Sequence, residues 1–322
     1  MENREASQLL AVQRLDVRFG AHVALRDVSF DLAAGETVGL VGESGSGKST
    51  LARAVLQLIP QATGEVLFEG VSLPSAKRAH LRRLRRNLQM VFQNPLGSLN
   101  PRMSVAETLA EPLKIHEPGL SARARAWRIA EMLERVDLVH AAHRLPHEFS
   151  GGQCQRIGIA RAMMSRPKLL ICDEPVSSLD VSIQGQIINL LMDLQRESGM
   201  AMLFISHNLA VVRQMSHRVL VIYRGRLVES ATRDALFDAP AHPYTRALLA
   251  AVPAPQRIAV GATPPDAREE RTPDSGAGGE GCAWYPRCTR AIDACAASVP
   301  RLEEVAPGHA AACHRRHEVV YS

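Results

Sequence analysis

The chain has 322 residues, of which 46% are apolar and 22% are charged, and its formal net charge is +5. This length and composition are typical of a folded protein with one large core plus appendages, which excludes a disordered or fibrous chain. No apolar run reaches the ~20 residues of a membrane-spanning helix, and the opening M-E-N-R-E-A-S-Q-L-L lacks the apolar stretch of a secretory signal. We therefore expect a protein that stays in the cytosol.

The first distinctive segment is G-E-S-G-S-G-K-S at residues 42–49. An apolar strand is expected before it at residues 36–41 and a helix after it at residues 49–58, which is the context of a phosphate-binding loop. Its glycines let backbone N–H groups turn inward, and the new helix adds its positive end. The lysine should contact the β- and γ-phosphates, and the serine after it should bind Mg²⁺. The predicted nucleotide-binding residues are Gly42, Ser44, Gly45, Ser46, Gly47, Lys48, Ser49 and Thr50.

An arginine-rich run follows, with five arginines among the nine residues 78–86. Contact with nucleic acid or anionic lipid is one interpretation of such a run. The run contains no aromatic residue to stack on bases, and its leucines keep helical spacing. A solvated helix face is therefore the favoured interpretation.

Three further apolar runs each end at a polar residue. Residues 88–92 end at Gln93, residues 169–172 end at Asp173 and Glu174, and residues 202–206 end at His207. Ligands of open parallel sheets bind beyond the carboxyl ends of the strands, so these side chains should gather at one edge. Asp173 is then the second Mg²⁺ anchor, and Glu174 orients or deprotonates an attacking water. Gln93 and His207 can contact the γ-phosphate, the metal or that water, although each alone fits a simpler structural role.

A second anion-binding helix start is predicted at F-S-G-G-Q, residues 149–153. Ser150 can cap the following helix, while Gly151 and Gly152 leave backbone donors exposed. One nucleotide does not need two such cradles. Residues 94–164 as a whole are expected to be helical, with Gln93 at one end of this insert and the F-S-G-G-Q segment at the other.

These motifs together resemble the ATP-binding cassette (ABC) family, whose signature L-S-G-G-Q stands at a similar distance before the L-L-I-C-D-E segment. The resemblance implies that two cassettes dimerise head to tail and that each ATP lies between one phosphate loop and the partner's signature. Residues Ser150, Gly151, Gly152 and Gln153 would then act in trans.

The same resemblance implies that Phe19 stacks on adenine, although a core strand position is an alternative for it. It makes Gln93 a Mg²⁺ contact in the family's Q-loop and His207 the switch histidine. The sequence departs from the family pattern at Phe149, Ser178 and Asn208, which removes no catalytic group, and at Cys154, where the closest subfamily usually has arginine.

Three segments, residues 93–105, 174–184 and 242–249, indicate that subfamily. They resemble the corresponding segments in the ATPase subunits of dipeptide, oligopeptide and nickel importers, specifically the second (F-type) of the two paralogous ATPases in such systems. The resemblance implies ATP hydrolysis coupled to import of peptides or related solutes. The implied partners are a paralogous ABC ATPase in a heterodimer, two transmembrane permease subunits and, indirectly, an extracytoplasmic solute-binding protein, with no nucleic acid. The protein would lie peripherally on the cytoplasmic face of the inner membrane. The alternative is a non-transport ABC ATPase acting as a switch on ribosomes or DNA, which usually carries a second cassette or a long basic linker.

Four of the six cysteines lie near the C-terminus, after a Pro-, Gly- and Ala-rich stretch at residues 253–281 that is expected to be an irregular linker. In a cytosolic chain such a cluster favours metal over disulfides. Its gaps of five, six and seventeen residues leave zinc, an iron–sulfur cluster and free thiols all open. The subfamily resemblance, with C-A-W-Y-P-R-C and a terminal C-H, implies a 4Fe-4S cluster on Cys282, Cys288, Cys295 and Cys313.

The predicted fold is α/β: a phosphate-loop NTPase core of the ABC cassette type with an all-helical insert and an irregular, cysteine-containing C-terminal extension. The core is assigned to residues 1–93 and 165–235, the helical signature subdomain to 94–164 and the extension to 236–322. Because the phosphate loop lies in another part of the chain, we expect basal ATP hydrolysis by the core to largely survive replacement of any one of these cysteines.

Overall fold

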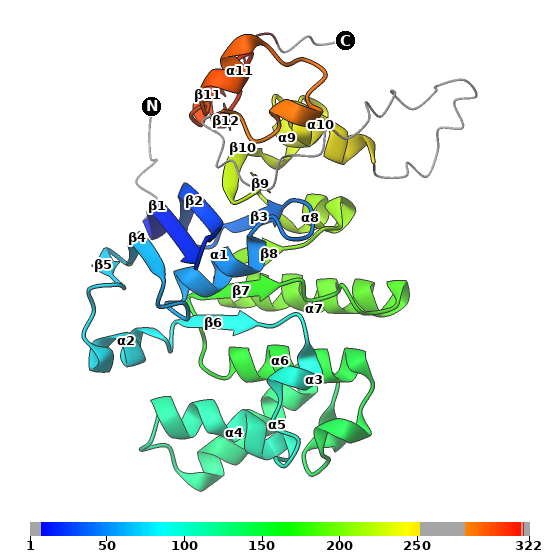
Figure 1. Cartoon of the computed structure of the whole chain (residues 1–322). Coiled ribbons are helices and arrows are strands. Elements are labelled where there is room, and N and C mark those ends of the chain that lie inside the picture. Colours follow the sequence, from blue (N-terminus) through cyan, green and yellow to red (C-terminus); the bar gives the residue numbers. More distant parts are fainter. Residues whose placement is uncertain (1–7, 252–280, 317, 319–322) are drawn as a thin grey trace.

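The computed structural model describes residues 8–251, 281–316 and 318. Figure 1 shows a long sheet with the C-terminal extension at one end and a group of helices beyond the other end. Most of the expected linker at residues 253–281 lies outside the described residues. Across the described ranges, no helix is both long and apolar enough to cross a membrane.

The main sheet is mixed, and its central strands are parallel. Strands β3, β7 and β8 are buried at every position, as expected for strands covered on both faces. Five neighbouring strands from β9 to β6 run parallel, so their carboxyl ends share one edge. In spatial order the strands are β11 (Glu303–Ala306), β12 (His309–Ala311), β10 (Arg226–Thr232), β9 (Arg218–Tyr223), β3 (Thr37–Val41), β8 (Ala201–Ile205), β7 (Leu169–Asp173) and β6 (Leu88–Val91).

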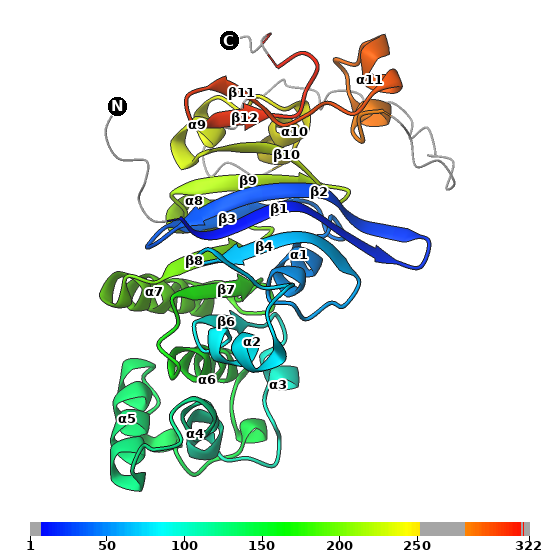
Figure 2. The same cartoon turned by 90° about the vertical axis from the view of Figure 1, so that its left-hand side faces the viewer.

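A second, antiparallel sheet covers one face of the main sheet, with helix α1 (Lys48–Val55) packed in the same apolar core (Figure 2). Strand β2 alternates exposed and buried residues from Asp27 to Leu32, the pattern of a sheet with one solvent-exposed face, whereas residues 9–12 of β1 are all buried. The motifs of the sequence do not distinguish this sheet from the rest of the core. Its strands, in order, are β2 (His22–Ala33), β1 (Gln8–Phe19), β4 (Ala62–Phe68) and β5 (Val71–Ser72).

Helices cover the opposite face and build a second core cluster, which continues into the helical insert. The helices on this face and towards the C-terminal end of the main sheet are α7 (Val181–Ser198), α8 (Leu209–Met215), α9 (Arg233–Asp238) and α10 (Pro243–Ala250). The insert contains α3 (Pro95–Ser98), α4 (Val105–His116), α5 (Ala122–Arg135), the 3-10 turns η1 (Val139–Ala141) and η2 (Pro146–Glu148), and α6 (Gly151–Met163). The predicted helical character of residues 94–164 is therefore confirmed.

Helix α2 (Arg78–Leu84) carries the arginine run and has no buried residue, in agreement with a solvated helix face. The extension has η3 (Tyr285–Arg287), α11 (Asp293–Ala297) and the strands β11 and β12. Strand β12 pairs with β10, so the extension continues the main sheet instead of hanging from it as an irregular tail.

Candidate nucleotide site

The phosphate loop leaves β3 at Val41 and becomes helix α1 at Lys48. Two glycines are required by the close approach of neighbouring backbone. A Cβ on Gly42 would stand 2.2 Å from the Ile222 carbonyl oxygen, and one on Gly47 would stand 2.8 Å from the Ala24 carbonyl oxygen. Gly47 also has φ of +107°, which other residues rarely adopt. The loop is therefore wedged against β2 and β9, with the start of α1 beside it.

The Lys48 ammonium lies inside this loop. Its Nζ donates to the carbonyl oxygens of Gly42 at 2.8 Å and Glu43 at 3.0 Å, and it stands 3.8 Å from a carboxylate oxygen of Glu174. Burial lowers the pKa of Lys48, while the carboxylates of Glu174 and Asp173 act in the opposite direction. A cation held only by loop carbonyls and one carboxylate can turn to an incoming phosphate without breaking a packed core contact.

A hydroxyl and a carboxylate suited to Mg²⁺ meet directly below the loop. The Ser49 Oγ donates to Asp173 Oδ1 at 2.8 Å, which joins the first turn of α1 to the end of β7. Burial raises the pKa of Asp173, and the Ser49 hydrogen bond opposes that rise. Both are hard oxygen ligands, so the donor set fits Mg²⁺, whose charge would compensate the buried carboxylate.

The three other predicted strand-end residues also come together. The Glu174 carboxylate accepts from Gln93 Nε2 at 3.1 Å and lies 3.3 Å from His207 Nδ1. These side chains follow β7, β6 and β8, and they gather at one edge of the sheet as expected for residues at the carboxyl ends of parallel strands. Glu174 has φ of +46°, a strained backbone for a residue with a side chain. The cluster can orient a water molecule and accept its proton.

Phe19 closes β1 and is 45% exposed, so its ring is free to stack on a base and does not belong to the core. The alternative of a packed strand residue is thus not what the structure shows. Strand β2 begins at His22, so Phe19 stands at the turn of the β1–β2 hairpin.

The signature segment begins helix α6 with a capping box, in which Ser150 and Gln153 satisfy each other's backbone N–H groups. Gly152 is buried against Ile183, whereas Gly151 is exposed. Between the described residues, no hydrogen bond or ion pair joins Ser150–Gln153 to the phosphate loop of the same chain. Cys154 is fully buried beneath the segment, with its sulfur against the Pro146 carbonyl.

The four C-terminal cysteines are free thiols that line one small cavity of about 10 Å³. The Cys282 N–H donates to the Cys295 carbonyl at 2.7 Å, which closes the loop that carries Cys288. Burial raises the pKa of Cys282 to about 11, and the other thiols add to the rise. Even so, no group of His, Cys, Asp or Glu within the described ranges already has the spacing of a metal site.

The cysteine segment lies against the phosphate loop in space, although the two are far apart in the sequence. Arg287 Nη1 lies 3.2 Å from a carboxylate oxygen of Glu43, inside the phosphate loop. The Glu43 N–H donates to the hydroxyl of Tyr244 at 2.8 Å. Because β12 continues the main sheet next to β10, the extension folds back against the loop. Tyr244 lies in residues 242–249 (H-P-Y-T-R-A-L-L), a segment that resembles the importer ATPases but whose sequence does not indicate its structural role.

Comparison with known proteins agrees with this geometry. Residues 25–177 match the ABC transporter family, and residues 228–295 match the oligopeptide/dipeptide transporter C-terminal region. The chain is 50% identical over 298 residues to a Brucella ovis protein named for peptide import and ATP binding, covering 90% of this chain and 91% of that one. It is 47% identical over 289 residues to the oligopeptide transport ATP-binding protein OppF of Escherichia coli, covering 87% and 84%.

Two solved structures show the same cassette. One is cbiO1 from Clostridium perfringens, part of the ABC transporter complex cbiONQ, with a TM-score of 0.64 and 26% identity over 71% of this chain and 90% of that chain. The other is a dimeric ATP-binding cassette, MJ0796, in a post-hydrolysis state with ADP and Pi, with a TM-score of 0.64 and 28% identity over 70% and 98%.

The fold and the site therefore define an ATP-binding cassette ATPase, as the resemblance carried by the F-S-G-G-Q segment implied. More narrowly, the chain belongs to the ABC transporter family and, by its C-terminal region, to the oligopeptide/dipeptide type within it.

Proposed function

We propose that this chain is the ATP-hydrolysing subunit that energises import of peptides or related small solutes through partner membrane subunits. The observation that carries the proposal is the meeting of Gln93, Glu174 and His207 beside the Ser49–Asp173 pair. The relatives named for peptide import support the transport role. A ribosome or DNA switch is not favoured, because no relative described above carries such a name.

Each side chain of the site has a distinct role in hydrolysis. Lys48 would bind the phosphates, and Ser49, Asp173 and Gln93 would hold Mg²⁺. When bound, that ion would supply positive charge that stabilises the phosphates. Glu174 accepts the proton of the attacking water, and His207 holds the Glu174 carboxylate on the side facing that water. Phe19 orients the adenine.

The second half of each ATP site comes from another cassette. Ser150, Gly151, Gly152 and Gln153 act in trans, because a capped helix start with an exposed glycine offers donors that its own phosphate loop does not use. The partner cassette is the paralogous ATPase. Val181, which directly follows residues 177–180 in the segment that the ABC family calls the D-loop, is 84% exposed. An apolar side chain so exposed is consistent with burial in such a dimer.

An apolar groove between β6, α1 and α4 is the docking surface for a permease subunit. The cavity there holds about 290 Å³, and its rim includes Leu58, Phe92, Pro112 and Ile115. Leu58 and Ile115 are 47% and 45% exposed, which is unusual for large apolar side chains unless a partner covers them. The groove joins the core, residues 1–93 and 165–235, to the signature subdomain, residues 94–164, so docking there couples hydrolysis to movement.

With two permease subunits and a solute-binding protein outside, the complex holds this chain on the cytoplasmic face of the inner membrane. Purifying the chain from membranes together with its co-expressed permeases tests this arrangement. Ile115→Glu should release the chain from the permeases while soluble ATP binding stays within about twofold of wild type. Normal co-purification of Ile115→Glu would remove the groove from the interface, and Trp127→Glu, an exposed apolar position on α5, is the matched control.

The extension, residues 236–322, holds a 4Fe-4S cluster on its four cysteines. Four thiols around one cavity are the right donor set, although a cavity of about 10 Å³ must open to admit the cluster. Full-length protein purified without oxygen should be brown and contain iron and acid-labile sulfide in similar amounts. Cys295→Ser should bleach it, whereas Cys154→Ser, in the helical subdomain, should not. A colourless preparation with stoichiometric zinc, or with no metal, would refute the cluster.

A further inference from the structure

One peptide unit of the phosphate loop joins the catalytic lysine to the C-terminal half of the chain. The Gly42 carbonyl oxygen accepts from Lys48 Nζ at 2.8 Å, and the Glu43 N–H of the same peptide donates to Tyr244 Oη at 2.8 Å. A peptide group is planar and rigid, so the hydrogen bond on one side fixes the direction of the oxygen on the other. Tyr244 therefore helps to set where the ammonium of Lys48 lies.

Tyr244 is held firmly enough for that task. It is 1% exposed, and its ring packs 4.5 Å from the Tyr223 ring and 5.1 Å from the Trp284 ring. Its own N–H donates to His242 Nδ1 at 3.0 Å, and the N–H of His242 donates to the buried carboxylate of Glu229 at 2.9 Å. A tyrosine in a packed aromatic cluster with a fixed backbone loses little further entropy in making the bond.

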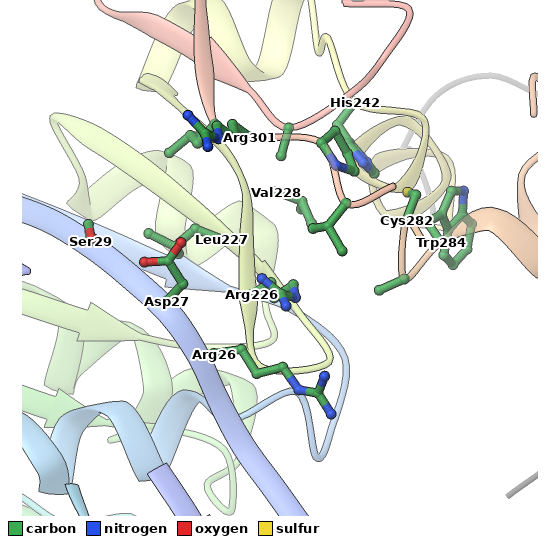
Figure 3. A pocket seen from close by; sticks show the side chains of 15 residues that line it. Arg26, Asp27, Ser29, Arg226, Leu227, Val228, His242, Cys282, Trp284 and Arg301 are labelled. Carbon is green, nitrogen blue, oxygen red and sulfur yellow. The ribbon is translucent and has the colours of Figure 1, made fainter. Parts of the chain in front are cut away.

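The cysteine segment contacts Glu43, the residue whose N–H is bound by Tyr244, through the Glu43 side chain. The Arg287 guanidinium lies over the Trp284 ring, 4.5 Å from its centre, and 3.2 Å from the Glu43 carboxylate. Arg287 directly precedes Cys288, and Trp284 lies two residues after Cys282. Figure 3 shows Trp284 and Cys282 side by side near His242, on the side of the extension that faces β10.

We propose that Tyr244 and Arg287 are positioning residues for the ATPase site. They hold the Gly42–Glu43 peptide and the Glu43 side chain, and through them they keep Lys48 directed for binding the phosphates. The C-terminal extension is thereby part of the nucleotide site, and its folding sets ATP affinity. The proposal needs only the ATP site and is independent of the solute that the complex carries.

Equilibrium binding of a fluorescent ATP analogue to the full chain, with steady-state hydrolysis by the assembled complex, tests the proposal. Tyr244→Phe removes one hydrogen bond and should weaken binding and raise KM about threefold to tenfold. Arg287→Ala removes a half-exposed ion pair and should weaken binding about twofold to fivefold. In both variants kcat at saturating ATP should stay within about twofold, because Glu174 and His207 follow strands β7 and β8 and contact neither Tyr244 nor Arg287 within the described residues.

Matched controls separate positioning from stability. Tyr285→Phe removes a hydroxyl from the same extension, and Arg301→Ala removes a guanidinium from it, and neither residue contacts Glu43 within the described structure. Both should bind ATP as wild type does. Arg287→Lys should restore binding towards wild type, and Glu43→Gln combined with Arg287→Ala should be no worse than Arg287→Ala alone.

The proposal is overturned if Tyr244→Phe and Arg287→Ala bind ATP as tightly as their controls. It is also overturned if affinity falls only in step with the thermal unfolding midpoint, which would make the contacts mere packing. Arg287 is half exposed, so its variant remains informative should Tyr244→Phe fold poorly. Absence of solute import by the assembled wild-type complex would instead count against the transport role, and it would leave this conclusion standing because the proposal concerns ATP affinity alone.

Discussion

At the scale of single residues, the site depends on carboxylates whose places were predictable and on contacts that were not. Asp173 and Glu174 follow an apolar run, and that pattern alone located them at the edge of the sheet. The bond between Glu43 and Tyr244 spans 201 positions, and no local periodicity relates residues so far apart. Only the packing of the extension against the main sheet brings them together.

The water-activating role that we propose for Glu174 gives the sharpest test at this scale. Glu174→Gln keeps the size of the side chain and its ability to form hydrogen bonds, but the amide cannot accept a proton from water. Turnover should therefore fall by ~10²–10⁴-fold while ATP binding persists. Losing the carboxylate 3.8 Å from Lys48 should not weaken binding of an anionic ligand. Single-turnover hydrolysis measures the first effect, and Glu117→Gln is a control in the helical insert. Wild-type turnover would remove Glu174 from the mechanism.

At the scale of elements, the start of α6 explains why the signature needs two different glycines. A Cβ on Gly152 would stand 2.5 Å from Ile183 Cγ2 of α7, whereas one on Gly151 would meet its nearest neighbour, Leu179, at an ordinary 3.6 Å. Gly152 therefore serves packing between α6 and α7, and Gly151 keeps the helix start open to a ligand. The sequence located both glycines but not this division of roles.

Gly152→Ala should accordingly destabilise the chain by about 1–3 kcal/mol through overpacking, and Gly151→Ala should not. Thermal unfolding of the two variants measures the difference. Truncating the neighbour in Gly152→Ala/Ile183→Ala should recover part of the loss relative to the sum of the single changes. If the two glycine variants melt at the same temperature, the contact with Ile183 does not decide this position.

The region where residues 242–245 pack beside strands β10 and β12 should lose stability at acid pH. Burial lowers the pKa of His242 to about 4, beside the Glu229 carboxylate that also binds His309. The unfolded chain therefore takes up a proton near pH 6.5 that the folded chain refuses. Stability should be full above pH ~6.5 and fall by about 2 kcal/mol between pH 7 and pH 5.

Thermal unfolding as a function of pH measures this loss. His242→Gln should melt lower at pH 7, since it loses imidazole contacts, but its melting temperature should depend less on pH than that of wild type. Parallel pH profiles for the two proteins would show that another group governs the acid sensitivity.

At the scale of the whole molecule, the segments at the two ends of the main sheet both reach the edge that carries the nucleotide site. The helical insert, with the groove that we propose for permease docking, lies beyond β6, and the extension adds β12 and β11 beside β10 (Figure 1). The sequence indicated the cassette, the insert and the cysteine cluster because each carries a local motif. It did not indicate the antiparallel sheet or the continued main sheet, because strands such as β1 and β12 find their partners through long-range pairing that local patterns do not specify.

We propose that ATP hydrolysis by this chain drives import through its membrane partners. The most direct test of this proposal is uptake of labelled peptides into proteoliposomes that contain the permeases, both ATPases and the solute-binding protein, with ATP on the cytoplasmic side. We predict uptake with ATP, none with a non-hydrolysable analogue, and a loss in Glu174→Gln that matches its loss of turnover. ATP hydrolysis by a fully assembled complex without accumulation of any peptide or related solute would contradict the account.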